Sequence, residues 1–482
     1  MSFFISLKHV NLYFRYDNEC HDKPLRCLGE LEKYFYYWGL LCGDTFPLKI
    51  TLSSKYPIRV KHVVDSISAL VRQHPILLSI FSKTRNNVQL LKSGETQEYV
   101  EVLPKEKFDS IFESFTLENK VWRFLMLERE EEEPHTLTVM FAIHHTLSDF
   151  VYNRQIMRSF VNNLCSIQLG KSPSIDIVYH PSDPIETVVD NIEIKSVGTE
   201  IKTCSSEKTV MAIDALCRSN SKQANLIWTE NSSRTLRMKL DAELSKAFEA
   251  SRSLCKGSLN ATILTVCLKS FMRMLGSSLS QNEAVNIPFT FMVDLRRYIG
   301  KTLQYIGNAS IDMLCYITLS SAESFNEQFW QIANNISQKI REIVQCGEPV
   351  RKIKEDAGQL YLKASEKEYP KEAIAFTHVG NIDDYLGDVT DIELVDIKPN
   401  VNVSFSLSSI FHVMTHVSKG EMHFCIAYDS NVIPIIRHKH LSMKLIKLYD
   451  KYVDDKLTDH QLALIYRFIG KINKTIILLT KN

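Results

Sequence analysis

Two adjacent histidines, His144 and His145, are followed after three residues by Asp149, and these side chains are the strongest candidates for chemistry in the chain. An imidazole titrates near neutral pH, so a positioned histidine can take a proton from a reacting group as a general base. A carboxylate at this spacing can orient a histidine or cap a following helix. The alternative is a noncatalytic histidine pair that is satisfied within the core.

The residues around the histidine pair predict a strand, a junction and a helix. Residues 139–143 (VMFAI) form a continuous apolar run, which is typical of a strand buried on both faces. Neighbouring side chains of a strand point to opposite faces, so only one of the two histidines can face a given cavity. An apolar stripe over 150–168 predicts an amphipathic helix, with Ser148 or Asp149 as its N-cap.

The apolar periodicity elsewhere predicts strands mixed with helices in both halves of the chain. Residues 121–127 and 136–143 should pair as a hairpin around an acidic turn at 128–133. Further helices are expected over 29–38, 61–72, 242–254, 261–275, 325–343 and 434–453, and further strands over 46–52, 235–240, 285–293, 401–407 and 422–428. The second half resembles the first in plan, although no sequence repeat is visible.

The length and the fading of periodicity predict two lobes. A chain of 482 residues exceeds one hydrophobic core of ordinary size. Periodicity is weak between about 168 and 228, where Ser and Pro are frequent. We therefore place an N-terminal lobe with the histidine motif at 1–185, a linker at 186–228 and a C-terminal lobe at 229–482.

Composition narrows the class of protein. Hydrophobic and charged contents of 45% and 23% are those of a soluble globular protein, and a net charge of +1 argues against nucleic acid as the main partner. No stretch of eighteen apolar residues is present, so we expect no membrane span. The eleven cysteines are scattered and form no CxxC pair, which favours reduced thiols in a cytoplasmic protein over disulfides or a zinc site.

The segment His144-His145-Thr146-Leu147-Ser148-Asp149 resembles the HHxxxD signature of the acyltransferase superfamily. This superfamily includes chloramphenicol acetyltransferase, alcohol acetyltransferases, condensation domains and polyketide-associated acyltransferases. Four further segments resemble family segments in the same order, namely 26–32 (RCLGELE), 66–81, 293–296 (VDLR) and 306–308 (IGN). The resemblance implies an α/β fold of two similar chloramphenicol-acetyltransferase-like lobes, with mixed sheets flanked by helices and an active site in the tunnel between the lobes.

The resemblance also implies an activity and roles for particular residues. It implies transfer of an acyl group from a thioester, with acyl-CoA favoured as co-substrate, to a hydroxyl or amine. His145 would be the general base and His144 its supporting neighbour. Asp149 would be a structural brace that pairs with an arginine, for which Arg296 is the candidate. The alternatives are that Asp149 only caps the helix and that Arg296 is a surface charge.

Other positions bear on substrate access. Phe150 stands where the family usually has glycine, and its ring should narrow the channel beneath the histidine. Ser404 and Ser406 lie in an alternating run and could face the tunnel as oxyanion donors, although an exposed sheet face is the simpler interpretation. We expect no bound cofactor, no metal and a monomer. The chain has no carrier motif of its own, so a carrier-bound donor would come from a separate acyl carrier protein.

Two rival functions stay open from the sequence. One is a stand-alone condensation enzyme that takes its donor from an acyl carrier protein. The other is a noncatalytic binding or interaction protein that retains the fold, with Phe150 blocking the tunnel. Donor identity, acyl chain and acceptor are not set by any motif that we find.

Overall fold

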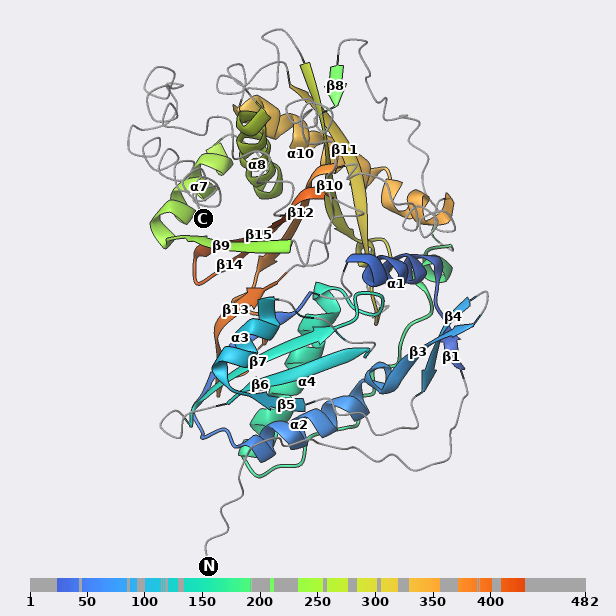
Figure 1. The fold of residues 1–482 in the computed structure, drawn as a ribbon, viewed down its shortest axis with the longest axis vertical. Coiled ribbons are helices and arrows are strands. Elements are labelled where there is room, and N and C mark those ends of the chain that lie inside the picture. The colour runs from blue at the N-terminus through green and yellow to red at the C-terminus, as the bar shows by residue number, and fades with distance from the viewer. Residues whose placement is uncertain are drawn as a thin grey trace, which may run out of the picture.

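The computed structural model describes twelve parts of the chain: 24–42, 46–84, 87–92, 100–128, 134–192, 209–211, 233–254, 258–275, 284–319, 329–355, 372–400 and 409–429, with short gaps inside some of them. The predicted strand at 401–407 and the predicted helix at 434–453 lie outside the described residues, as do Ser404 and Ser406. Two mixed sheets, one in each lobe, dominate the described part (Figure 1).

The sheet of the first lobe has five strands in the order β13-β2-β7-β6-β5. Its strands are β2 (Leu48–Ser54), β5 (Val100–Leu103), β6 (Trp122–Leu127), β7 (Thr136–Ile143) and β13 (Ile392–Pro399). The predicted hairpin is confirmed, because β6 and β7 pair antiparallel with Trp122 opposite Ile143. All but the first and third residues of β7 are buried, as the apolar run predicted for a strand covered on both faces.

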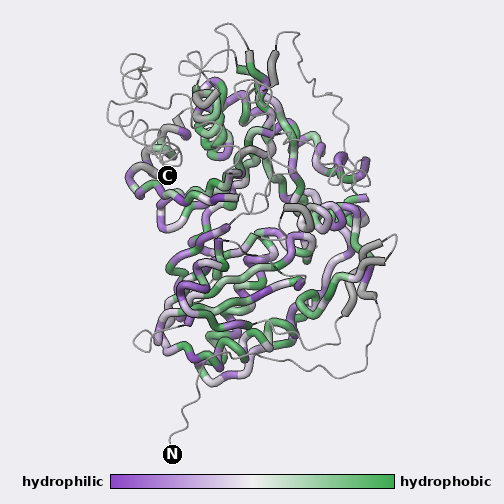
Figure 2. The backbone as a smooth tube through the Cα atoms, viewed as in Figure 1, coloured by the Kyte–Doolittle hydropathy of each residue, from purple (hydrophilic) through white to green (hydrophobic). Residues whose placement is uncertain are grey.

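Helices cover both faces of this sheet. The helices are α2 (Val60–Gln73), α3 (Lys105–Glu113) and α4 (Phe150–Gln168). The apolar faces of α2 and α4 share one core cluster with alternate residues of the strands, such as Val139 and Phe141. Met140, on the other face of β7, packs in a second cluster with Phe108 and Phe112 of α3. Figure 2 shows the hydrophobic residues that run along the central strands.

The sheet of the second lobe has the order β11-β10-β12-β14-β15-β9, and β8 pairs with β10. Its strands are β8 (Thr209–Met211), β9 (Ser233–Leu240), β10 (Ala284–Asp294), β11 (Ser310–Leu319), β12 (Glu372–Asn381), β14 (Ser409–Ser418) and β15 (Glu421–Asp429). The neighbours β10, β12 and β14 run parallel, and the other ladders on the main path are antiparallel. Helices α7 (Ala242–Leu254), α8 (Leu259–Leu275) and α10 (Phe329–Gln345) belong to this lobe.

The two lobes exchange elements, so the division at 186–228 needs correction. Strand β13 comes from the second half of the chain but pairs antiparallel with β2 in the first sheet. Conversely, Leu31 and Phe35 of α1 (Glu30–Cys42) pack in the core of the second lobe. Strand pairing depends on tertiary partners rather than on position in the chain, which explains why periodicity could not place β13.

The segment predicted as a linker also contributes to the second lobe. Helix α5 (Ile185–Val189) buries Ile185 and Val189 in the same core as α8 and β10. Strand β8 adds to the second sheet beside β10. A smaller sheet of β1 (Pro24–Cys27), β4 (Asn87–Lys92) and β3 (Ser79–Thr84) completes the described architecture.

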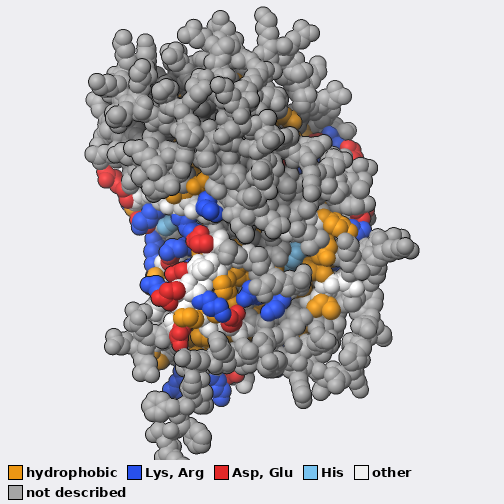
Figure 3. Space-filling view, in the orientation of Figure 1, with side chains coloured by type: hydrophobic (Ala, Val, Ile, Leu, Met, Phe, Trp, Pro, Cys, Tyr) orange, Lys and Arg blue, Asp and Glu red, His pale blue; other side chains and the backbone are white. Residues whose placement is uncertain are grey.

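The described surface carries charges of both signs. On the face drawn in Figure 3, Lys, Arg, Asp and Glu side chains are intermingled over β9, β13 and α3. Ion pairs such as Lys239–Glu421 and Lys398–Asp396 account for part of this mixture. Among the helices of the described residues, none is long and apolar enough to cross a membrane.

Candidate active site

The histidine pair lies where β7 ends and the chain turns toward α4. The His144 amide donates to the Val121 carbonyl at 2.8 Å, which is the last rung between this strand and its partner. The chain then turns, and the Leu147 amide donates to the His144 carbonyl at 2.9 Å. Helix α4 begins at Phe150, and the Asp149 carboxylate caps it by accepting from the Tyr152 amide at 3.0 Å. The predicted strand-to-helix junction is therefore present.

His145 is held as a neutral imidazole with a defined proton position. Its Nδ1 lies 2.8 Å from the Ser148 carbonyl oxygen, and since a carbonyl only accepts, the Nδ1 proton points there. Burial lowers the pKa of His145, although the Ser148 bond and the charge of Asp149 oppose that effect. The ring packs between Phe35 and Phe46, at centroid distances of 4.3 and 4.6 Å. The neutral tautomer leaves Nε2 with the lone pair that a base requires.

His144 has different neighbours. Its ring contacts Phe81 at 4.8 Å and stacks near Tyr36 at 6.0 Å. Its Nδ1 accepts from the Thr146 amide at 3.2 Å. Burial, and then the proximity of His145, lowers the pKa of His144 to about 3. This set of contacts fits a supporting position in the aromatic core.

A cavity of about 230 Å³ lies against His145 between the two lobes. Phe46 and Phe150 line it from the first lobe, and Met292, Thr377 and His412 line it from the second. The Phe150 ring also packs on Tyr385, at 5.5 Å between centroids, so it forms part of the cavity wall. Among the described residues, His145 lines this cavity and His144 does not.

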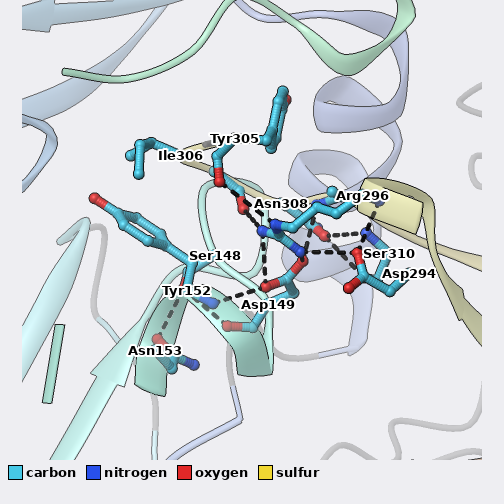
Figure 4. A network of polar contacts seen from close by, with 12 residues as sticks. Ser148, Asp149, Tyr152, Asn153, Asp294, Arg296, Tyr305, Ile306, Asn308 and Ser310 are labelled. Atoms are coloured by element: carbon cyan, nitrogen blue, oxygen red, sulfur yellow. Dashed lines mark hydrogen bonds and ion pairs between the residues drawn. The ribbon is translucent and has the colours of Figure 1, made fainter. Parts of the chain in front are cut away.

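The Asp149 carboxylate accepts four hydrogen bonds, and three of them join the two lobes. Besides the Tyr152 amide, its carboxylate accepts from Arg296 Nη1 at 2.7 Å, from Arg296 Nη2 at 3.2 Å and from the Ala309 amide at 2.9 Å (Figure 4). The structure thus places the predicted arginine in a bidentate pair with this carboxylate, just after β10 in the turn Leu295–Arg297. Such a pair fixes geometry as well as charge.

Arg296 is in turn held by the segment that follows. Its Nη2 donates to the Gly307 carbonyl at 2.6 Å, and its guanidinium lies 5.7 Å from the centre of the Tyr305 ring. Gly307 has φ +143°, a backbone region that favours glycine. Its carbonyl is thereby presented to the arginine in a segment that a larger side chain would strain.

Asn308 makes a second bridge between the lobes, which the sequence did not reveal. Its buried amide Nδ2 donates to the His145 carbonyl at 2.7 Å. Its Oδ1 accepts from the Ser310 amide and hydroxyl at 3.0 and 2.8 Å. The segment 306–308 resembles a family segment, but that resemblance assigns no role to this residue. Asn308 therefore positions the backbone of the histidine that lines the cavity.

Thr377 and His412 are further cavity residues that sequence reasoning missed. They stand on the adjacent strands β12 and β14, and their side chains approach each other within 3.5 Å. The available signal was the alternation of His412, Met414 and His416 along one strand, which places all three side chains on one face. Among the described residues, no group of three or more His, Cys, Asp or Glu side chains is arranged to hold a metal ion.

Comparisons with known proteins rest on structure. No family model and no curated protein sequence matches the chain. Polyketide synthase associated protein 5 from Mycobacterium tuberculosis matches with a TM-score of 0.57 and 15% identity, over 86% of this chain and 97% of that one. Trichothecene 15-O-acetyltransferase from Fusarium sporotrichioides matches with a TM-score of 0.59 and 14% identity, over 94% and 95% of the two chains.

A third similar structure is a condensation domain. The condensation domain of the monacolin K polyketide synthase matches with a TM-score of 0.56 and 11% identity, over 96% of this chain and 99% of that one. These matches extend over both lobes, because nearly the whole of each chain is covered. The chain therefore has the two-lobed, chloramphenicol acetyltransferase-like α/β fold that condensation domains and acetyltransferases share.

Proposed function

We propose that this protein is an acyltransferase that moves an acyl group from a thioester donor to a hydroxyl or amine acceptor. The observation that carries the proposal is His145, a neutral imidazole whose proton is held on Nδ1 by Ser148 and which lines a cavity between the lobes. The similarity in fold to an acetyltransferase and to condensation domains supports the same class of reaction.

In the proposed reaction His145 acts as the base. Nε2 takes the proton of the acceptor as its oxygen or nitrogen bonds to the thioester carbon, and the carbonyl electron pair becomes an oxyanion. The oxyanion then collapses, the carbon–sulfur bond breaks, and the leaving thiolate takes the proton from the imidazolium. Asn308 and Ser148 hold the histidine, through its carbonyl and its Nδ1, while the proton moves at Nε2.

The donor in this proposal is acyl-CoA, with a carrier-bound thioester as the alternative. The alternative is supported by the similarity in fold to the condensation domain of a polyketide synthase. Offering the same acyl group on coenzyme A and on a phosphopantetheinylated carrier protein would separate the two donors. The rival without chemistry is a binding protein whose cavity Phe150 restricts.

We predict that His145→Ala lowers the turnover number about 10²–10⁴-fold, because the acceptor then loses its proton without a base. Free thiol release from a panel of acyl-CoA donors, supplied with alcohols and amines, measures the change. His180→Ala is the matched control, since this histidine is exposed and should leave turnover unchanged. If wild type and His145→Ala are equally inert with every donor, carrier-bound thioesters included, the binding-protein interpretation replaces the proposal.

The pH profile gives a separate prediction. Because the neutral imidazole is the active form and burial lowers the pKa of His145 from its ordinary value near 6.5, the acidic limb of kcat/KM should be centred below about pH 6.5 and the profile should be level from about pH 7.5 to 8. It should fall only at lower pH, where the imidazole gains a proton. Initial rates across this range, with circular dichroism to confirm folding at each pH, provide the measurement. An acidic limb centred above pH 7 would contradict the assigned base.

A further inference from the structure

The part of the cavity wall that the second lobe supplies carries two hydrogen-bonding side chains side by side. Thr377 lies on β12 and His412 on β14, and the two strands run parallel in the second sheet. Both side chains line the cavity. The Thr377 hydroxyl oxygen is 3.5 Å from His412 Nε2. That distance is longer than an ordinary hydrogen bond between these groups, so the pair satisfies itself poorly.

The protonation state of His412 suits a hydrogen-bond donor rather than a general acid. Burial, and then the proximity of His145, lowers the pKa of His412 to about 4. The imidazole is therefore neutral at physiological pH and keeps one N–H. Among the described residues, the nearest hydrogen-bonding side chain to His412 is Thr377, and the nearest to Thr377 is His412. A neutral imidazole can polarise a carbonyl and stabilise the negative charge that develops on its oxygen.

The His145 and His412 rings both lie near the ring of Phe46. Phe46 is 4.6 Å from the His145 ring and 6.0 Å from the His412 ring, measured between centroids. The base side of the cavity thus belongs to the first lobe and the donor pair to the second. A carbonyl group bound between them would have its carbon toward His145 and its oxygen toward β12 and β14.

We propose that His412 and Thr377 form the oxyanion site of the transfer reaction, with the imidazole N–H and the hydroxyl both donating to the thioester carbonyl oxygen. Two donor atoms 3.5 Å apart can each lie about 2.8 Å from one oxygen, which is a normal hydrogen-bond distance. In the reaction described above, the carbonyl electron pair passes to this oxygen when the acceptor attacks. It returns when the carbon–sulfur bond breaks. The inference rests on the proposed acyl transfer and assigns the stabilisation of its oxyanion to these two side chains.

Substitutions at His412 and Thr377 distinguish hydrogen-bond donation to the oxyanion from a role in packing alone. His412→Leu should lower kcat about 10²–10³-fold with little change in KM, because the donor acts on charge that appears in the transition state. His412→Gln keeps an N–H at a similar reach and should recover part of that loss. Thr377→Val should lower kcat about tenfold, as expected for one neutral hydroxyl donor.

His416→Leu is the matched control for His412→Leu. This residue stands on the same face of β14, four positions further along, and does not line the cavity at His145. Its substitution removes an imidazole from the same strand and should leave kcat unchanged at neutral pH. A kcat of His412→Leu within threefold of wild type would overturn the inference while leaving acyl transfer intact.

A spectroscopic measurement tests the inference without turnover. In the His145→Ala background, acetyl-CoA with a ¹³C carbonyl should bind without reacting, and the donor pair should shift its carbonyl stretch to lower wavenumber than in solution. Adding His412→Leu should return the stretch toward its solution value. An unchanged stretch in the double variant would overturn the assignment. Absence of thiol release from wild type with every donor would instead contradict the proposed function, and the inference would fall with it.

Discussion

Asp149→Ala is expected to lower the free energy of unfolding by about 3–5 kcal/mol, because it removes the buried bidentate partner of Arg296 and leaves that guanidinium only the half-exposed carboxylate of Asp294. The Arg296 side chain is 16% exposed and that of Asp149 is 6% exposed, so water cannot replace the lost carboxylate. The Tyr152 and Ala309 amides lose their acceptor in the same substitution. Urea unfolding followed by circular dichroism measures the change.

A second ion pair between the lobes supplies the control. Asp384, in the turn after β12, pairs with Arg154 of α4 at 2.6 Å, but its side chain is 70% exposed. Asp384→Ala should therefore cost only about 0–1 kcal/mol. Equal losses from Asp149→Ala and Asp384→Ala would contradict the bracing role. The double variant Asp149→Leu with Arg296→Leu should be less damaging than Asp149→Ala alone, because no charge is then left buried.

The kinetics of Asp149→Asn test whether Asp149 also affects the histidine. The negative charge of Asp149 raises the pKa of His145. Its removal should therefore move the acidic limb of kcat/KM to lower pH, while the amide keeps much of the local shape. A purely structural role would reduce the amount of folded enzyme without moving this limb.

Local patterns in the sequence were sufficient to predict the elements that carry the motif. The apolar run before His144 and the stripe after Asp149 each depend only on neighbouring residues, and α4 begins and ends where the stripe predicted. The pairing of Asp149 with Arg296 came from the resemblance, since no local signal joins residues 147 positions apart. Strand β13 shows the limit of local reasoning, because we predict no strand at 392–399 from the sequence and no local pattern indicates the sheet that it joins.

The cavity residues that the second lobe supplies could not be predicted from the sequence for the same reason. His412 and Thr377 lie on strands that are ordinary in sequence, and only the parallel pairing of β12 with β14 brings their side chains together. The serines proposed as oxyanion donors, Ser404 and Ser406, lie outside the described residues. Asn308 had a visible motif, but its partner is a backbone carbonyl, which no sequence pattern reports.

Acidification from pH 7.5 to 5 is expected to destabilise the protein through its buried histidines. Burial lowers the pKa of His74, His144 and His416 to about 3 in each case, against an ordinary value near 6.5. The unfolded chain therefore binds more protons below pH 6.5, and stability falls as pH drops. Each histidine accounts for about 2 kcal/mol over this range, so the three together account for about 6 kcal/mol.

Glu372 opposes this trend. Burial raises the pKa of Glu372 to about 8. Its carboxyl therefore takes up a proton in the folded protein at a higher pH than in the unfolded chain. Its linkage stabilises the fold by about 3 kcal/mol as pH falls from 7.5 to 5, which leaves a net loss of about 3 kcal/mol from these four groups. Below pH 4.5 this compensation ends, and only the histidine contribution continues to change.

His416→Leu isolates one histidine from this sum. The ring is buried, stacks on His423 at 4.7 Å, and its Nε2 has no hydrogen-bond partner among the described residues, so leucine should cost little at pH 7.5. The difference in unfolding free energy between pH 7.5 and 5 should become about 2 kcal/mol smaller than in wild type. His180→Leu, at an exposed position, should leave that difference unchanged. Urea titrations of wild type and both variants at the two pH values give the unfolding free energies. Equal pH dependence in wild type and His416→Leu would show that this imidazole is not held neutral by the fold.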